Sequence, residues 1–143
     1  GHEVRPVQGL HPDPRAGGAC GLYRTPGAFL EEVRAEYEER RDLLCKILAG
    51  IPGVTFRRPE GAFCLSARIP VDDAQAFAVW MMEEFELDGE TVLVAHLEGF
   101  YATAGLGRDE IRLCYALEKA KLARAGEILA AGPAAYVRRR GRP

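Results

Sequence analysis

The sequence has no long hydrophobic run, almost no net charge and no paired cysteine motif. No apolar stretch approaches the roughly 20 residues that a membrane-spanning helix needs, so we expect no membrane partner. A formal net charge of −2 at pH 7 offers no basic surface for nucleic acid. The cysteines are scattered without a CxxC pair, which favours a reducing, cytoplasmic location over a disulfide framework; they are Cys20, Cys45, Cys64 and Cys114.

Familiar catalytic and metal-binding motifs are also missing. The sequence contains no GxSxG, no HExxH and no P-loop. His2, His11 and Cys20 are possible metal ligands, but their spacing fits no known template, so we interpret them as loop residues and expect no metal. His96 could act as an acid, a base or a ligand. The sequence places no partner beside it, which favours an ordinary loop histidine.

The N-terminal third predicts an irregular lead followed by one long helix. Residues 1–24 contain prolines and glycines that break any periodicity, so they form an irregular or disordered lead. Thr25-Pro26 is typical of a helix start, and Gly50 with Pro52 is typical of a helix end.

The middle of the chain predicts a hairpin and a second helix. Residues 54–56 and 62–69 indicate two antiparallel strands, and the second strand alternates apolar residues on one face, namely Phe63, Leu65, Ala67 and Ile69. Asp72 and Asp73 could form a carboxylate pair for acid–base chemistry, but capping of the next helix is favoured. That helix carries an aromatic stripe that is typical of core rather than of a binding site: Phe77, Trp80, Met81 and Phe85.

The last third predicts two strands and a closing helix. The apolar residues Thr91–Ala95 suggest a strand covered on both faces, and Ile111–Tyr115 suggest another. The final helix is predicted to end at Gly132-Pro133, so that residues 133–143 form a basic tail. The fold class is therefore α+β, a two-layer domain over residues 25–132 with helices on one face of a small, mostly antiparallel sheet.

Arg112 is the candidate binding residue. Ile111, Leu113 and Tyr115 share one face of their strand, so Arg112 points to the other face. A guanidinium that is not solvated needs a fixed anion, because desolvating an unpaired charge costs several kcal/mol. Its planar fork suits a carboxylate held by two hydrogen bonds, although an ion pair with a neighbouring acidic side chain is an alternative.

Three ordered motifs resemble the class I/II pyridoxal-phosphate-dependent aminotransferases of fold type I. Residues 98–116, EGFYATAGLGRDEIRLCYA, resemble the C-terminal signature of that family. Residues 59–65, PEGAFCL, resemble its "PEGAFYLF" strand, and residues 36–42 resemble its long interdomain helix. The match covers roughly residues 22–131 in the same order as the C-terminal small domain of that family.

The resemblance implies that Arg112 binds the substrate α-carboxylate and that the Gly99–Gly107 loop is part of a closing wall. It also implies a pyridoxal 5′-phosphate cofactor, amino acid and 2-oxo acid substrates, and a homodimer. None of Lys46, Lys119 and Lys121 matches the lysine that binds the cofactor, which lies in the family's large domain. We therefore expect a part of a transaminase that is inactive alone and exposes apolar surface. A stand-alone module that binds a small carboxylate or a protein partner is the alternative.

Overall fold

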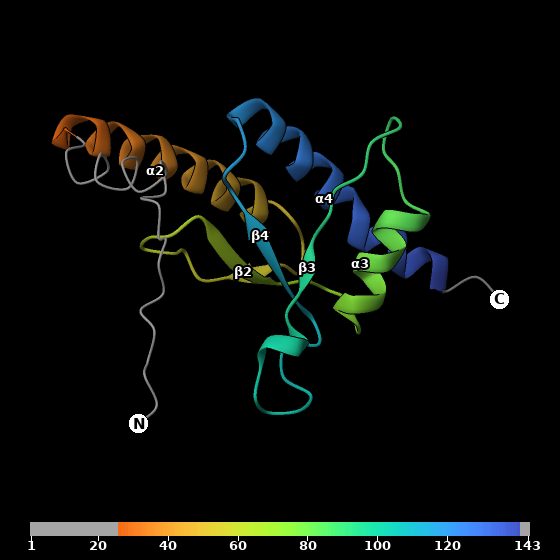
Figure 1. Cartoon of the computed structure of the whole chain (residues 1–143). Helices are drawn as coiled ribbons and strands as arrows, with labels where there is room; N and C mark the ends of the chain where they lie inside the picture. The colour runs from red at the N-terminus through yellow and green to blue at the C-terminus, as the bar shows by residue number, and fades with distance from the viewer. Residues whose placement is uncertain (1–25, 141–143) are drawn as a thin grey trace, which may run out of the picture. The chain divides into compact units, whose positions relative to one another are not determined.

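The computed structural model describes residues 26–140. The chain divides into two compact units, residues 1–35 and 36–143, and the arrangement below is that of the second unit. The elements, labelled in Figure 1, are α2 (Gly27–Ala49), β1 (Thr55–Phe56), β2 (Cys64–Arg68), α3 (Ala74–Glu83), β3 (Ala95–His96), the short 3-10 helix η1 (Glu98–Phe100), β4 (Glu110–Cys114) and α4 (Lys119–Arg140). The proposed cap Thr25 lies outside the described residues.

The strands form one four-stranded sheet in the order β1-β2-β4-β3, and each neighbouring pair is antiparallel. Strands β2 and β4 are the two central strands, and they pair over five residues each. This confirms the predicted α+β class with a small antiparallel sheet. The strand that carries Arg112 is therefore fixed on both sides by backbone hydrogen bonds.

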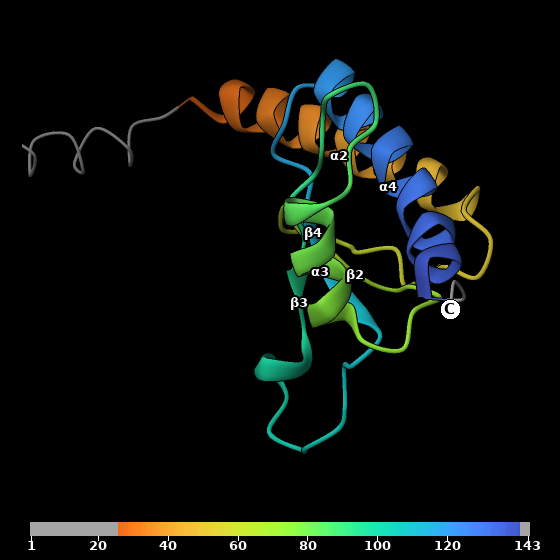
Figure 2. The same cartoon turned by 90° about the vertical axis from the view of Figure 1, so that its right-hand side faces the viewer.

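Burial alternates strictly along both central strands. Leu65 and Ala67 on β2 are buried, as are Ile111 and Leu113 on β4, whereas the residues between them are partly or fully exposed. The buried side chains belong to one core cluster with residues from α2, α3 and α4, among them Leu44, Leu48, Phe77, Met81, Leu122 and Leu129. The helices thus cover one face of the sheet, as predicted, and no helix among residues 26–140 covers the other face (Figure 2).

Helix α3 begins at the predicted place. Asp73 is its N-cap, and the Asp73 carboxylate accepts a hydrogen bond of 2.8 Å from the backbone N–H of Ala76. Asp72 instead forms an ion pair with Arg140, which lowers the pKa of the Asp72 carboxyl. The two carboxylates therefore have separate structural roles. The predicted core stripe is also confirmed, since Phe77, Trp80 and Met81 are buried and Phe85 packs against the core.

The predicted C-terminal end of the last helix was wrong. Helix α4 continues through Pro133 to Arg140, although proline in a helix interior costs about 3 kcal/mol. Tertiary contacts offset this cost, because Gly132 and Pro133 are buried and Tyr136 packs edge-on against Phe77 at 5.4 Å. The basic residues at the end are also partly paired, since Arg139 bonds Glu84 at 2.6 Å.

Two strand predictions also need correction. The strand expected at residues 91–95 is reduced to the edge strand β3, and Leu93 is 73% exposed rather than covered. The Thr91 hydroxyl donates to the carbonyl of Met81, so this segment bonds α3 instead of a neighbouring strand. Strand β2 begins at Cys64, two residues later than expected, because Ala62 has a positive φ of 64°. Phe63 therefore lies outside the strand and is 56% exposed.

Helices α2 and α4 approach closely where Gly126 meets Ile47. A Cβ at position 126 would lie 2.6 Å from Cγ2 of Ile47. We expect Gly126→Ala to destabilise the chain, because overpacking costs about 1–3 kcal/mol and exceeds the roughly 1 kcal/mol by which alanine is the better helix former. In an Ile47→Ala background the clashing methyl groups are gone, so the same substitution should become stabilising. Urea denaturation of the four proteins measures this change of sign, and equal effects in both backgrounds would contradict the close packing.

Candidate functional site

Arg112 lies in the middle of β4 on the open face of the sheet. Its side chain is exposed, and its cross-strand neighbours are Ser66 on β2 and Ala95 on β3. The guanidinium carbon lies 5.3 Å from the centre of the Phe100 ring, which η1 places beside the sheet. This cation–π contact restrains the guanidinium without neutralising its charge.

The acidic side chain nearest to Arg112 along its strand face is already engaged. Glu110 accepts a hydrogen bond of 3.2 Å from Arg68 and one of 2.5 Å from the hydroxyl of Tyr101. The bond to Glu110 is also the main cause that raises the pKa of Tyr101. Among the ion pairs that residues 26–140 make with one another, none involves Arg112. Within the described residues, no carboxylate therefore neutralises this guanidinium.

An open hollow of about 480 Å³ adjoins Arg112. It is lined by the loop that joins β1 to β2 and by the start of β2, namely Arg57, Arg58, Pro59, Glu60, Cys64, Leu65 and Ser66, together with Arg112. Three arginines and one glutamate give this hollow a positive balance. Its electrostatic character favours a small anion over a cation.

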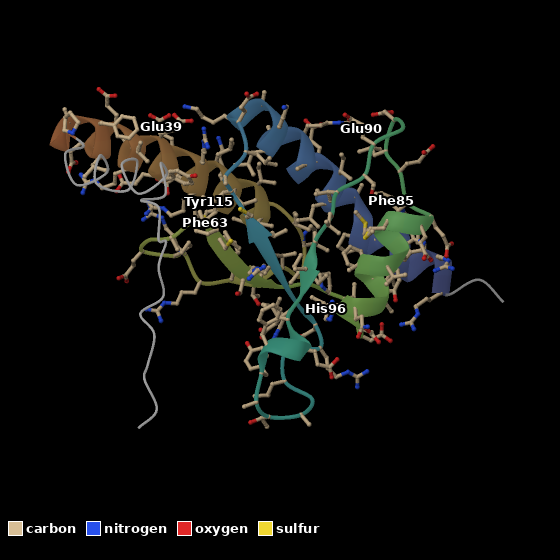
Figure 3. The ribbon with its side chains drawn as sticks, in the orientation of Figure 1. Glu39, Phe63, Phe85, Glu90, His96 and Tyr115 are labelled. Atoms are coloured by element: carbon tan, nitrogen blue, oxygen red, sulfur yellow. The ribbon has the colours of Figure 1, made fainter. Side chains whose placement is uncertain are left out.

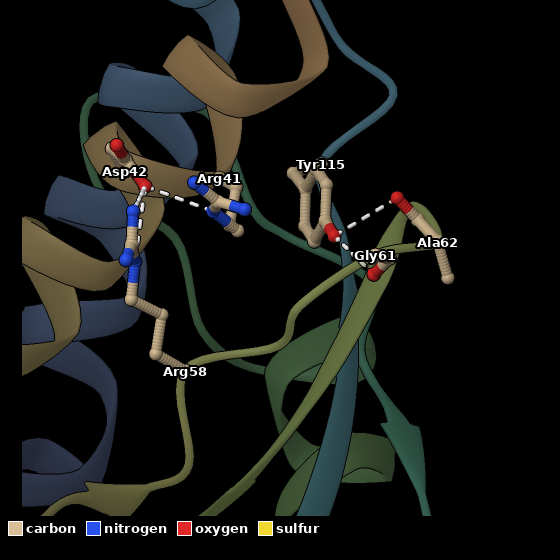
Figure 4. Close-up of polar contacts among 6 residues, drawn as sticks. All are labelled: Arg41, Asp42, Arg58, Gly61, Ala62 and Tyr115. Atoms are coloured by element: carbon tan, nitrogen blue, oxygen red, sulfur yellow. Dashed lines mark hydrogen bonds and ion pairs between the residues drawn. The ribbon is translucent and has the colours of Figure 1, made fainter. Parts of the chain in front are cut away.

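Two polar anchors fix the loop that lines the hollow (Figure 4). Arg58 donates to the Asp42 carboxylate on α2 at 2.7 Å, and Arg41 donates to the same oxygen at 2.9 Å. These bonds, the one from Arg41 first, lower the pKa of Asp42. At the other end of the loop, the buried hydroxyl of Tyr115 donates to the carbonyls of Gly61 and Ala62 at 3.1 and 3.0 Å. The loop that joins β1 to β2 is therefore bonded to α2 through Arg58 and to the residue after β4 through Gly61 and Ala62.

The glycine-rich loop that joins η1 to β4 turns back toward the sheet at its two glycines. Gly105 and Gly107 both have positive φ, and Gly107 is buried against the ring of Tyr101. The backbone N–H of Glu110 donates to the carbonyl of Gly107 at 3.1 Å, which connects the loop to β4. This geometry places Phe100 and Tyr101 next to Arg112 and Glu110, respectively.

The other candidates from the sequence do not join this site. His96, labelled in Figure 3, lies on the edge strand β3. It pairs with Ile111, so it lies on the opposite face of the sheet from Arg112. Lys46 and Lys121 are exposed on helices, and Lys119 bonds Glu39 and Glu36, which raises its pKa. His2, His11 and Cys20 lie outside the described residues, and no metal-binding cluster of acidic, histidine or cysteine side chains occurs within the described ones.

Sequence reasoning missed the partners that surround Arg112. Phe100 lies within the motif at residues 98–116, and Arg57 and Arg58 directly precede the motif at residues 59–65. Their closeness to these motifs was the one feature of the sequence that could have identified them. The proximity of Arg57 and Arg58 to Arg112 depends on the pairing of β2 with β4, which joins residues 42 to 50 positions apart. Phe100 reaches Arg112 because η1 places its ring beside the sheet. No helix in the described part of the chain has the length and apolar character required to cross a membrane.

Comparison with known proteins identifies the relationship. The chain is 31% identical over 95 residues to an aspartate aminotransferase of Pyrococcus horikoshii, which covers 65% of this chain and 22% of that protein. It is 32% identical over 102 residues to an aspartate aminotransferase of Bacillus subtilis, covering 69% of this chain and 24% of that one. The chain therefore spans about a quarter of the length of these relatives.

The fold agrees with the sequence match. The crystal structure of a kynurenine aminotransferase of Pyrococcus horikoshii, in complex with PMP, aligns with a TM-score of 0.66 at 21% identity, covering 85% of this chain and 28% of that one. No protein-family model matches the chain. On these likenesses of sequence and fold, the chain is related to the pyridoxal-phosphate-dependent aminotransferases and corresponds to their C-terminal small domain.

Proposed function

We propose that this chain is the substrate-carboxylate-binding part of an aminotransferase that transfers an amino group between an amino acid and a 2-oxo acid. The observation that carries the proposal is the position of Arg112, exposed on the open sheet face with its guanidinium restrained by Phe100. A carboxylate is the group that both substrates share, and a guanidinium fork can hold it by two parallel hydrogen bonds.

The surroundings of Arg112 favour an incoming carboxylate over an internal one. Glu110 is held by Arg68 and Tyr101, and Asp42 is held by Arg41 and Arg58. Since these acidic groups are already paired, they do not compete strongly for Arg112. Arg57 in the same hollow adds positive potential that attracts an anionic substrate, whereas Asp42 offsets the charge of Arg58.

The role of Arg112 in this proposal is orientation. A carboxylate held by two hydrogen bonds cannot rotate freely, so the rest of the substrate is presented in one direction. The loop from Gly99 to Gly107 forms part of a wall that closes over the bound substrate and excludes water. This closing role stays a proposal, supported by the contact between Phe100 and Arg112.

The described residues do not fit a site for pyridoxal phosphate. A lysine that bonds this cofactor must lose its proton, whereas Lys119 is held protonated by Glu39 and Glu36. Lys46 and Lys121 are exposed on helices, and neither they nor Lys119 line the hollow beside Arg112. We therefore assign no cofactor chemistry to this chain and propose that another part of the enzyme binds pyridoxal phosphate.

We also propose that the complete enzyme contains a large domain, forms a homodimer and is located in the cytoplasm. The support for the large domain is the length of the curated relatives, about four times that of the matched segment. The homodimer and the location rest on the resemblance alone. The N-terminal turns of α2 also carry exposed apolar side chains, Phe29, Leu30 and Val33, which a helix packed against a further domain would bury.

Substitution of Arg112 in the enzyme that contains this chain tests the proposal. Arg112→Lys keeps the charge but loses the paired hydrogen bonds, and one hydrogen bond to a charged group is worth about 1.5–3 kcal/mol. We therefore expect KM for the 2-oxo acid to rise roughly ten- to hundredfold, with a larger rise for Arg112→Ala. Steady-state kinetics measure this effect.

Arg138→Ala is the matched control, because Arg138 is an exposed arginine near the end of α4, away from the hollow. Its KM should equal that of the unsubstituted enzyme. An unchanged KM in Arg112→Ala would show that Arg112 does not bind the substrate carboxylate. If the chain alone bound a 2-oxo acid with no cofactor present and lost this on Arg112→Ala, the stand-alone carboxylate-binding module would be the better assignment.

A further inference from the structure

Two cysteines that are 50 positions apart in the sequence face each other at one end of the two central strands. Cys64 begins β2, Cys114 ends β4, and the two residues are direct partners in the antiparallel register. Both side chains lie on the open face, on the side of Arg112, because Ser66 pairs with Arg112 two residues further along. Cys114 is exposed and Cys64 is partly buried.

The hydrogen-bond pattern shows that these cysteines occupy the closer type of antiparallel pair. The N–H of Tyr115 donates to the carbonyl of Phe63 at 2.8 Å, and that of Ile69 donates to the carbonyl of Asp109, also at 2.8 Å. Both bonds join hydrogen-bonded pairs, and such pairs alternate with non-hydrogen-bonded ones. Cys64 and Cys114 therefore form a non-hydrogen-bonded pair.

This geometry is compatible with a disulfide. In a non-hydrogen-bonded pair the Cα atoms lie about 4.5 Å apart and the side chains approach closely. Disulfides need a Cα separation of about 4.4–6.8 Å, so the two sulfur atoms can join without movement of the strands. Burial is the main cause that raises the pKa of the Cys64 thiol, and the neighbouring Cys114 raises it further.

We propose that Cys64 and Cys114 are a redox-active dithiol that closes to a cross-strand disulfide on reaction with a low-molecular-weight disulfide. The exposed Cys114 thiolate attacks one sulfur of the reagent, a mixed disulfide forms, and one reagent thiolate leaves and takes up a proton. Cys64, deprotonated in turn, attacks the Cys114 sulfur and releases the second reagent thiol. The two protein thiols lose two electrons and two protons, and the reagent disulfide is reduced to two thiols.

The experiment uses the full chain carrying Cys20→Ser and Cys45→Ser, so that only the paired cysteines remain. The protein is treated with oxidised glutathione, and intact mass is followed with peptide mapping. We expect the mass to fall by two hydrogens, no lasting glutathione adduct, and a linked pair of peptides containing Cys64 and Cys114. Adding Cys64→Ser should instead leave one glutathione on Cys114, because the second attack is then impossible.

Persistent adducts on both cysteines, or an absence of the linked peptides, would overturn the proposal. Peptide mapping of the unsubstituted chain gives the same answer if the serine variants do not fold, since the linked peptides are identified directly. The readout requires neither substrate nor cofactor. It therefore stands or fails separately from the proposed carboxylate site, which is measured by kinetics of Arg112 variants.

Discussion

Replacing Phe77 with alanine is expected to lower the free energy of unfolding by about 3–5 kcal/mol, the usual cost of removing a buried phenylalanine ring. Phe77 is fully buried on α3, its ring packs edge-on against Tyr136 at 5.4 Å, and it lies 6.1 Å from the ring of Trp80. Its neighbours belong to helices with fixed contacts, so the cavity cannot collapse fully. Urea denaturation of the full chain measures the loss.

Phe63→Ala is the matched control for this prediction. It removes the same ring from a position that is 56% exposed and outside the core cluster. We expect a much smaller cost, because most of that ring is already in water. Equal losses for the two variants would mean that α3 does not pack on α4 as the structure has it.

Gly107→Ala is expected to lower the free energy of unfolding by about 2–5 kcal/mol, the second large effect. Gly107 has a φ of +75°, a conformation that costs about 1–2 kcal/mol for a residue with a Cβ. A Cβ there would also lie 2.5 Å from Cε2 of Tyr101 and 3.2 Å from the backbone nitrogen of Glu98, which adds about 1–3 kcal/mol of overpacking. Relief by moving Tyr101 would break its hydrogen bond to Glu110.

Gly105→Ala separates the two causes. Gly105 has a similar φ of +84°, but nothing lies within 4 Å of the Cβ that it would gain. It should therefore show the conformational cost alone and be the milder variant. Urea denaturation gives the global effect, and amide exchange of Glu110, whose N–H bonds the carbonyl of Gly107, reports the loop itself. A Tyr101→Ala background should reduce the cost at Gly107 but not at Gly105.

Much of the fold could be predicted from local patterns in the sequence. The alternation of apolar and polar residues along β2 and β4 predicted which face is buried, since side chains in a strand alternate by geometry. Asp72 and Asp73 were predicted to cap the next helix because a carboxylate before an apolar helix satisfies free backbone N–H groups, and the structure gives this role to Asp73. The exposed position of Arg112 opposite the core face followed from the same alternation.

Errors arose where long-range contacts outweigh local preference. Gly132-Pro133 carries a strong local signal for a helix end, but burial of Tyr136 and the pairing of Arg139 with Glu84 extend α4 past it. The strand expected at residues 91–95 is short because it lies at the sheet edge, where only β4 supplies hydrogen bonds. The free energies of these contacts depend on residues far away in the chain, so they cannot be predicted from a short stretch of sequence.

The sequence by itself determined the fold class, the buried face of the sheet, and the candidate Arg112 with the face on which it lies. Only the tertiary structure decided what surrounds that arginine: the ring of Phe100, the loop from Arg57 to Glu60, and the pairing of Cys64 with Cys114. The physical reason is that strand alternation is a local property of the backbone. Cross-strand register, in contrast, is set by the packing of the whole core against the sheet.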